Sequence, residues 1–141
     1  MPVRKAEATW KGDLPTGEGS MKLGSGAFEG PYSFKSRMQD GTGTNPEELI
    51  GAAHAGCYSM AFAFMLSNAG FKADSIHTKA DVKFEPVEGG FAITGIHLTT
   101  EGVVPGIDAV KFEEIAKQAK EGCPVSKVLT GTTITLDAKL V

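Results

Sequence analysis

The sequence is poor in several features, and each shortage excludes a class of protein. Its 141 residues carry 14 lysines and arginines against 17 acidic residues, a net charge of −3. Without a basic excess, binding to a nucleic acid backbone is not expected. The opening MPVRKAEATW has no apolar stretch of the kind that forms a secretory signal, so we expect a cytoplasmic protein. The length suits a single domain over residues 1–141, large enough to bury a core without metals or disulfides.

Cysteine is also scarce, because the chain contains only Cys57 and Cys123. A structural disulfide is uncommon in a cytosolic protein, and the two positions are too far apart to form a CxxC motif. Two interpretations stay open at this point. The cysteines are either two buried apolar side chains, or a nucleophile and a partner thiol that the fold brings together.

One segment resembles a membrane span at first sight. Residues Leu49 to Leu66 carry no charged side chain and reach the lower limit of a spanning length. The segment is rich in alanine, includes His54 and Ser59, and has no lysine or arginine directly beside it. We therefore expect the central helix of a soluble core and no membrane insertion.

The elements of the first third are short. Alternating apolar residues predict strands around Ala6 to Trp10, around Met21 to Leu23, and from Tyr32 toward Arg37. Stretches rich in glycine separate them and predict loops.

The helices have clear start and stop signals. Asn45 is a good N-cap, Pro46 suits the first helical position, and Glu48 stands where a capping box requires it. This first helix should run to about Ser67. A second helix is expected from about Asp108 to Glu121, and a short third helix after Cys123.

Three strands are predicted in the remainder. They cover Ile76 to Glu85, Phe91 to Leu98 and Ile134 to Leu140, and the second changes phase at Gly95, which indicates a β-bulge. The order of elements predicts an α+β fold with antiparallel sheets around a long central helix.

His54 is the first residue that invites a chemical interpretation, because it lies one helical turn before Cys57. It could activate the thiol, or it could join Cys57, Cys123 and either His77 or His97 at a zinc ion. The spacing matches no zinc motif. A hydrogen-bonded structural histidine is the interpretation we favour.

A reactive Cys57 would need a nearby cation, because burial raises the pKa of a thiol and the middle of a helix offers little help. The arginines of the chain are Arg4, close to the N-terminus, and Arg37. Strand alternation places Arg37 on a solvated face, which gives it no role. Cys123 follows a helix stop at a position that is typically exposed, so the residues alone favour it as the nucleophile.

Three segments change this assessment: GTNPEELIGAAHAGCYSMAF, AITGIHLTTEGVVPGID and AKEGCPVSKVL. Together with their spacing they resemble the OsmC/Ohr family of osmotically inducible and organic hydroperoxide resistance proteins, and the OsmC branch in particular. The resemblance covers nearly the whole chain.

The resemblance implies a thiol-dependent peroxidase with an intertwined α+β homodimer fold. By motif, Cys57 is the peroxidatic thiol and Cys123 the resolving thiol, Arg37 stabilises the thiolate, and Glu47 holds Arg37. The implied substrate is an organic hydroperoxide, and the implied reductant is a dithiol such as a lipoylated protein. No cofactor or metal is implied, because the sulfur atoms carry the redox chemistry.

Helix geometry adds an expectation about the dimer. Ten residues of one straight helix separate Glu47 from Cys57, or about 15 Å along the axis. A single site that contains both residues therefore requires two antiparallel helices from two chains. Two alternatives to an enzyme stay open: a dimer that binds a small apolar ligand, and a peroxide sensor that reacts only once.

Overall fold

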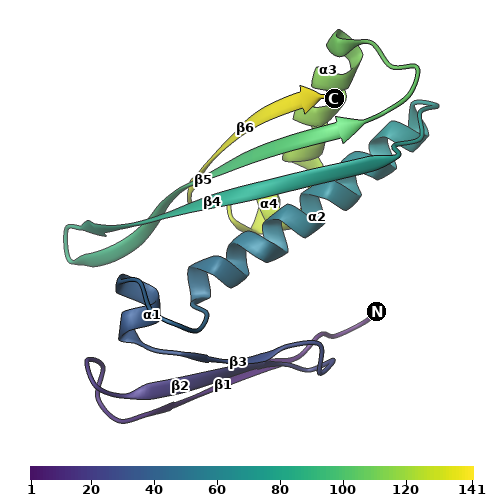
Figure 1. Ribbon diagram of the computed structural model, residues 1–141. Coiled ribbons are helices and arrows are strands. Elements are labelled where there is room, and N and C mark those ends of the chain that lie inside the picture. Colours follow the sequence, from purple (N-terminus) through teal and green to yellow (C-terminus); the bar gives the residue numbers. More distant parts are fainter. The chain divides into compact units, whose positions relative to one another are not determined.

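The computed structural model describes residues 1–141, which form two compact units, residues 1–49 and residues 50–141 (Figure 1). The first unit contains a small sheet and a short helix. The second contains a larger sheet and most of the helical residues.

The sheet of the first unit has three antiparallel strands in the order β1 (Ala6–Lys11), β2 (Glu18–Leu23) and β3 (Glu29–Tyr32). Trp10 and Tyr32 lie on either side of Gly19, and their ring centroids are 5.4 Å apart. A Cβ atom on Gly19 would come within 2.7 Å of both rings. Glycine at this position therefore lets the two aromatic rings pack across the middle strand.

The third predicted strand is only partly correct, because the chain turns into helix α1 (Phe34–Met38) directly after it. Ser33 caps this helix: its hydroxyl accepts the Ser36 N–H, and the Ser36 hydroxyl accepts the Ser33 N–H. This reciprocal pair favours a helix where alternation predicted an extended chain. Arg37 consequently lies on a helix and not at the end of a strand.

The long helix α2 (Pro46–Asn68) begins where the sequence predicted. The Asn45 side chain accepts the Glu48 N–H at 2.8 Å, as an N-cap should. The Glu48 carboxylate, however, accepts the Thr44 hydroxyl at 2.8 Å instead of closing a capping box. Gly70, with φ +91°, follows the end of the helix, as expected of a C-terminal glycine.

The second unit adds three strands and two helices: β4 (Ser75–Val87), β5 (Gly90–Val103), α3 (Ala109–Gly122), α4 (Pro124–Val128) and β6 (Thr133–Leu140). Strands β4 and β5 are antiparallel, but β5 and β6 are parallel. The expectation of purely antiparallel sheets is therefore wrong for the last pair. The helices α3 and α4 carry the chain back to the start of the sheet, which is the connection that parallel neighbours require.

The predicted bulge in β5 is confirmed. Lys83 of β4 pairs with Gly95, whereas the next residue, Phe84, pairs with Ile93, so Thr94 is the extra residue. The phase change in the sequence thus marks a real shift of register.

One face of this sheet packs against α2 and α3 (Figure 1). The hydrophobic core contains Tyr58, Phe62, Leu66, Ile96, Leu98, Val104, Ile107, Phe112, Ile115, Ala116, Ala119 and Cys123. All of these residues belong to the second unit.

Helix α2 is long and apolar enough to cross a membrane by length and composition alone. Tyr58, Phe62 and Leu66 along one face are nevertheless fully buried in the core. The opposite face is open, with Met60 76% and Phe64 66% exposed. The helix is therefore not enclosed on every side within this chain, which differs from the sequence-based expectation.

Candidate active site

The fold brings the two cysteines into contact. Cys57 lies in α2, and Cys123 lies at the junction where α3 ends and α4 begins. Both are free thiols, and Cys123 donates to Cys57 with the sulfur atoms 3.0 Å apart. Cys123 is fully buried, which contradicts the exposed position expected for it, whereas Cys57 is partly exposed. A reagent from solvent therefore meets Cys57 first.

The surroundings of Cys57 oppose its ionisation. Burial raises the pKa of this thiol above its ordinary value of 9.0, and its close pairing with the Cys123 sulfur raises it further. The backbone N–H of Val125 in α4 acts in the opposite direction. Because the raising effects dominate, residues 50–141 by themselves leave Cys57 protonated at neutral pH. A reactive thiolate would need an additional positive charge.

An arginine–carboxylate pair forms within residues 1–49. Arg37 of α1 meets Glu47 in the first turn of α2 through three contacts, with Nη2 to Oε1 at 2.6 Å and Nε to the two carboxylate oxygens at 3.1 and 3.2 Å. The Glu47 side chain is 9% exposed and that of Arg37 is 37% exposed. The prediction that Arg37 lies unused on a solvated strand face is therefore wrong. This geometry fixes the plane of the guanidinium while part of it stays accessible.

The structure thus pairs Cys57 with Cys123, and Arg37 with Glu47. Each pair lies inside one compact unit. The catalytic roles of these four residues stay predictions.

His54 has a partner that the sequence did not reveal. Its Nε2 lies 2.7 Å from the Oγ of Ser126 in α4, and both side chains are buried. The pKa of His54 is lowered by burial, so the ring is neutral at pH 7. Ser126 lies in the segment AKEGCPVSKVL that carries part of the family resemblance, but no role was predicted for it.

A hydrogen-bonded histidine was the favoured interpretation of His54, and this contact agrees with it. The zinc alternative finds no support, because no three His, Cys, Asp or Glu side chains are arranged to hold a metal ion. His97, one of its candidate ligands, instead contacts Thr135 and Asp137 on the sheet.

Tyr58 also connects α2 to the helix that leads to Cys123. Its hydroxyl donates to the backbone carbonyl of Ala116 at 3.0 Å, which links α2 to the helix that ends at Cys123. Burial raises the pKa of Tyr58 strongly, and the neighbouring Cys123 adds to this shift. Tyr58 therefore stays protonated at neutral pH and acts as a structural hydrogen-bond donor.

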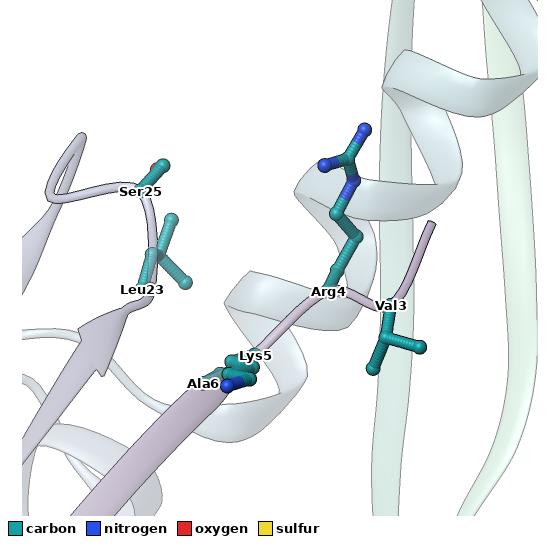
Figure 2. A pocket seen from close by; sticks show the side chains of 7 residues that line it. Val3, Arg4, Lys5, Ala6, Leu23 and Ser25 are labelled. Carbon is teal, nitrogen blue, oxygen red and sulfur yellow. The ribbon is translucent and has the colours of Figure 1, made fainter. Parts of the chain in front are cut away.

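The other arginine, Arg4, has different surroundings. It borders an open hollow of about 700 Å³ that Val3–Ala6 and Leu23–Ser25 line. Figure 2 shows the side chains of this lining. This hollow contains neither a cysteine nor a carboxylate. Of the two arginines, Arg37 is therefore the one that a carboxylate holds in place.

Comparisons with known proteins identify the family of the chain. A family model described as OsmC-like protein matches residues 39–138. The chain is 52% identical over 138 residues to Peroxiredoxin OsmC of Escherichia coli (strain K12), covering 97% of this chain and 96% of that protein. It is 31% identical over 106 residues to the organic hydroperoxide resistance protein OhrB of Bacillus subtilis (strain 168), covering 74% of each.

Solved structures share the fold. A crystal structure of an organic hydroperoxide resistance protein OsmC from Legionella pneumophila matches with a TM-score of 0.77 and 20% identity over 99% of both chains. That of OhrB of Bacillus subtilis matches with a TM-score of 0.73 and 26% identity, over 97% of this chain and 98% of the other. An α+β protein with a contacting dithiol is the class defined by fold and site. The chain belongs to the OsmC family.

Proposed function

We propose that the protein is a cysteine-based peroxidase that reduces organic hydroperoxides to alcohols. The observation that supports this most directly is the pair of free thiols at 3.0 Å, one partly exposed and one buried, in a chain of the OsmC family. A partly exposed thiol can meet a peroxide, and a buried neighbour can capture the product before it is oxidised further.

The reaction follows from thiol chemistry. The Cys57 thiolate attacks the terminal peroxide oxygen, the O–O bond breaks, and an alcohol leaves after taking up a proton. Cys57 is then a sulfenic acid. The Cys123 sulfur attacks the Cys57 sulfur, a disulfide forms, and the hydroxyl group leaves as water. A dithiol restores both thiols by exchange, and we propose a lipoylated protein as that reductant.

In this proposal Arg37 supplies the positive charge that Cys57 lacks. A guanidinium stays charged in a partly buried site and can hydrogen-bond both a thiolate and a peroxide oxygen. Glu47 keeps the guanidinium in one orientation through the contacts at 2.6 to 3.2 Å.

A homodimer is the arrangement we propose for the complete site. Glu47 and Cys57 are separated by about 15 Å along α2, so Arg37 held by Glu47 would serve Cys57 of a second copy. The open face of α2 supports this, because Met60 and Phe64 are exposed and a Cβ atom on Gly56 would meet nothing. Gly51, by contrast, faces Val82 of β4, so it allows contact with the sheet and not with a second helix.

The proposed substrates are bulky organic hydroperoxides, with hydrogen peroxide reduced more weakly, and the proposed location is the cytoplasm. Apolar side chains on α2 near Cys57 include Met60 at one turn and Phe64 at two turns. Each substrate methylene buried against such surface contributes about 0.8 kcal/mol.

Two cysteine substitutions test the proposal through peroxide consumption with a dithiol. Cys57→Ser should have no turnover, because the attacking sulfur is gone. Cys123→Ser should react once and then stop, and with excess peroxide its Cys57 should advance to the sulfinic acid, detectable by mass spectrometry.

Three results would contradict these assignments. Full turnover by Cys57→Ser would make Cys123 the nucleophile. A wild-type protein that consumes no peroxide would be a ligand-binding dimer, and one that reacts once despite excess dithiol would be a sensor.

A further inference from the structure

The hydrogen bond between His54 and Ser126 joins the two segments that carry the cysteines. His54 precedes Cys57 by three residues in α2, and Ser126 follows Cys123 by three residues in α4. The 2.7 Å contact therefore lies one helical turn from each sulfur atom. Neither side chain takes part in the chemistry described above, although both are buried.

Helix α4 is too short to hold its own position. It spans only Pro124–Val128, and Ser126 is its buried residue. Val128, at its end, is 77% exposed. A single turn of helix gains little stability from its backbone hydrogen bonds, so its placement depends on side-chain contacts with neighbouring elements.

The contact with His54 is well suited to fixing α4. Its partner α2 is a long helix packed in the core through Tyr58 and Phe62. Nδ1 of His54 is buried without a hydrogen-bond partner. An unpaired buried acceptor is tolerated better than an unpaired buried N–H, so the proton belongs on Nε2 and Ser126 Oγ accepts it.

We propose that His54 and Ser126 are positioning residues that hold Cys123 against Cys57 and thereby set the rate of disulfide closure. This inference rests on the proposed function, in which closure competes with further oxidation of Cys57. The bond acts through the turn Cys123–Ser126, which also contains the Val125 N–H that contacts the Cys57 sulfur.

The closure step can be measured without any peroxide. The Cys57 thiolate attacks one sulfur of oxidised glutathione, and the S–S bond of glutathione breaks. Cys57 is then a mixed disulfide with glutathione, and the other glutathione leaves as a thiolate. Cys123 then attacks the Cys57 sulfur, forms the protein disulfide and releases the second glutathione. The rate of this second release reports how well Cys123 is placed.

Ser126→Ala removes the acceptor and should slow this closure about tenfold or more, since misplacing a reacting group by about 1 Å is costly. His54→Leu removes the donor and should have the same effect. His54→Gln keeps an N–H near the position of Nε2 and should retain most of the closure rate. The double variant His54→Leu/Ser126→Ala should be no slower than either single variant, because both remove the same bond.

Ser59→Ala is the matched control. Ser59 is also a serine in this part of α2, and its hydroxyl donates to Thr78 of β4 at 2.8 Å, but this bond does not reach α4. Its closure rate should stay within about twofold of wild type. Melting temperatures of all variants should be recorded, because a purely structural role predicts slower closure in proportion to lost stability for Ser59→Ala as well.

Unchanged closure in Ser126→Ala and His54→Leu would overturn the inference, and so would equal slowing in Ser59→Ala. Multiplied effects in the double variant would also overturn it, because the two residues would then act independently. Failure of the peroxidase proposal is a separate result: the wild type would close its disulfide with glutathione but leave hydroperoxides intact.

Discussion

The two compact units of the chain differ in what they bury. Residues 50–141 contain every buried large apolar side chain, together with both cysteines. In residues 1–49 the buried positions are Gly30, Ser36, Thr44 and Glu47, none of which is a large apolar residue. The second unit has an ordinary hydrophobic core, whereas the first has an ion pair and a small sheet.

This difference has a consequence for stability. Burial of apolar surface is the main favourable contribution to folding, at about 25 cal/mol per Å². A unit of this size without buried apolar side chains has little of that contribution, while Leu14, Leu23 and Phe28 stay exposed on it. The first unit should therefore depend on packing against other protein surface, as the proposed dimer would provide.

The same difference has a consequence for chemistry. The thiol that would attack peroxide has its pKa raised by its own unit. The cation that would lower it belongs to the other unit, where Glu47 holds it. The difference between the units therefore predicts that neither unit is active without the other.

The largest effect is expected from mixing two inactive variants. Cys57→Ser lacks the thiol and Arg37→Ala lacks the cation, so each homodimer should be inactive. After co-refolding in equal amounts, a heterodimer has one site with both natural residues if Arg37 serves the partner's Cys57. Random pairing then restores about a quarter of wild-type activity, since half of the dimers are mixed and each has one intact site. Peroxide consumption measures this directly.

The same mixture also tests the alternative in which each chain forms its own site. If Arg37 and Cys57 act within one chain, every site in the heterodimer carries one defect and no activity returns. Two preparations refolded separately and then combined serve as the control, because exchange of subunits is excluded when they are assayed at once.

Most of the fold could be predicted because its signals are local. Asn45 and Pro46 start α2 where expected, and the phase change at Gly95 marks the bulge. Two errors had non-local or competing causes. The parallel pairing of β6 depends on where α3 returns the chain, and the helix at Arg37 depends on a cap by Ser33 that overrides strand alternation. The single domain over residues 1–141 stays a prediction beside the two compact units.

The site was less predictable than the fold. Resemblance to the OsmC family singled out Cys57 and Arg37, whereas residue patterns favoured an exposed Cys123 and an idle Arg37. Cys123 is buried at the junction where α3 ends and α4 begins, which no periodicity reveals. Ser126 was missed altogether, because a contact between residues 72 positions apart leaves no trace in spacing.

A smaller effect should separate the contribution of the Arg37 charge to kcat/KM from that of the apolar surface of α2. Wild type should have kcat/KM at least about tenfold higher for cumene hydroperoxide than for hydrogen peroxide, a difference that needs the burial of only about two methylene equivalents. Phe64→Ala, on the open face of α2, should reduce this ratio, whereas Arg37→Ala should lower both values together. Equal kcat/KM for the two peroxides in the wild type would exclude an apolar contribution from α2.

The smallest effect concerns stability and comes from the second unit alone. Burial lowers the pKa of His54 below its ordinary 6.5, so the folded state favours the neutral ring while the unfolded chain takes up a proton. The free energy of unfolding should therefore be constant above pH 6.5 as far as His54 is concerned, and should fall as the pH drops below it. For one proton the slope approaches about 1.4 kcal/mol per pH unit. His54→Gln removes this contribution, so denaturant unfolding at several pH values between 7 and 5 should give a flatter profile for the variant. Parallel profiles would show that His54 does not gain its proton on unfolding, and the neutral ring assigned to its bond with Ser126 would be wrong.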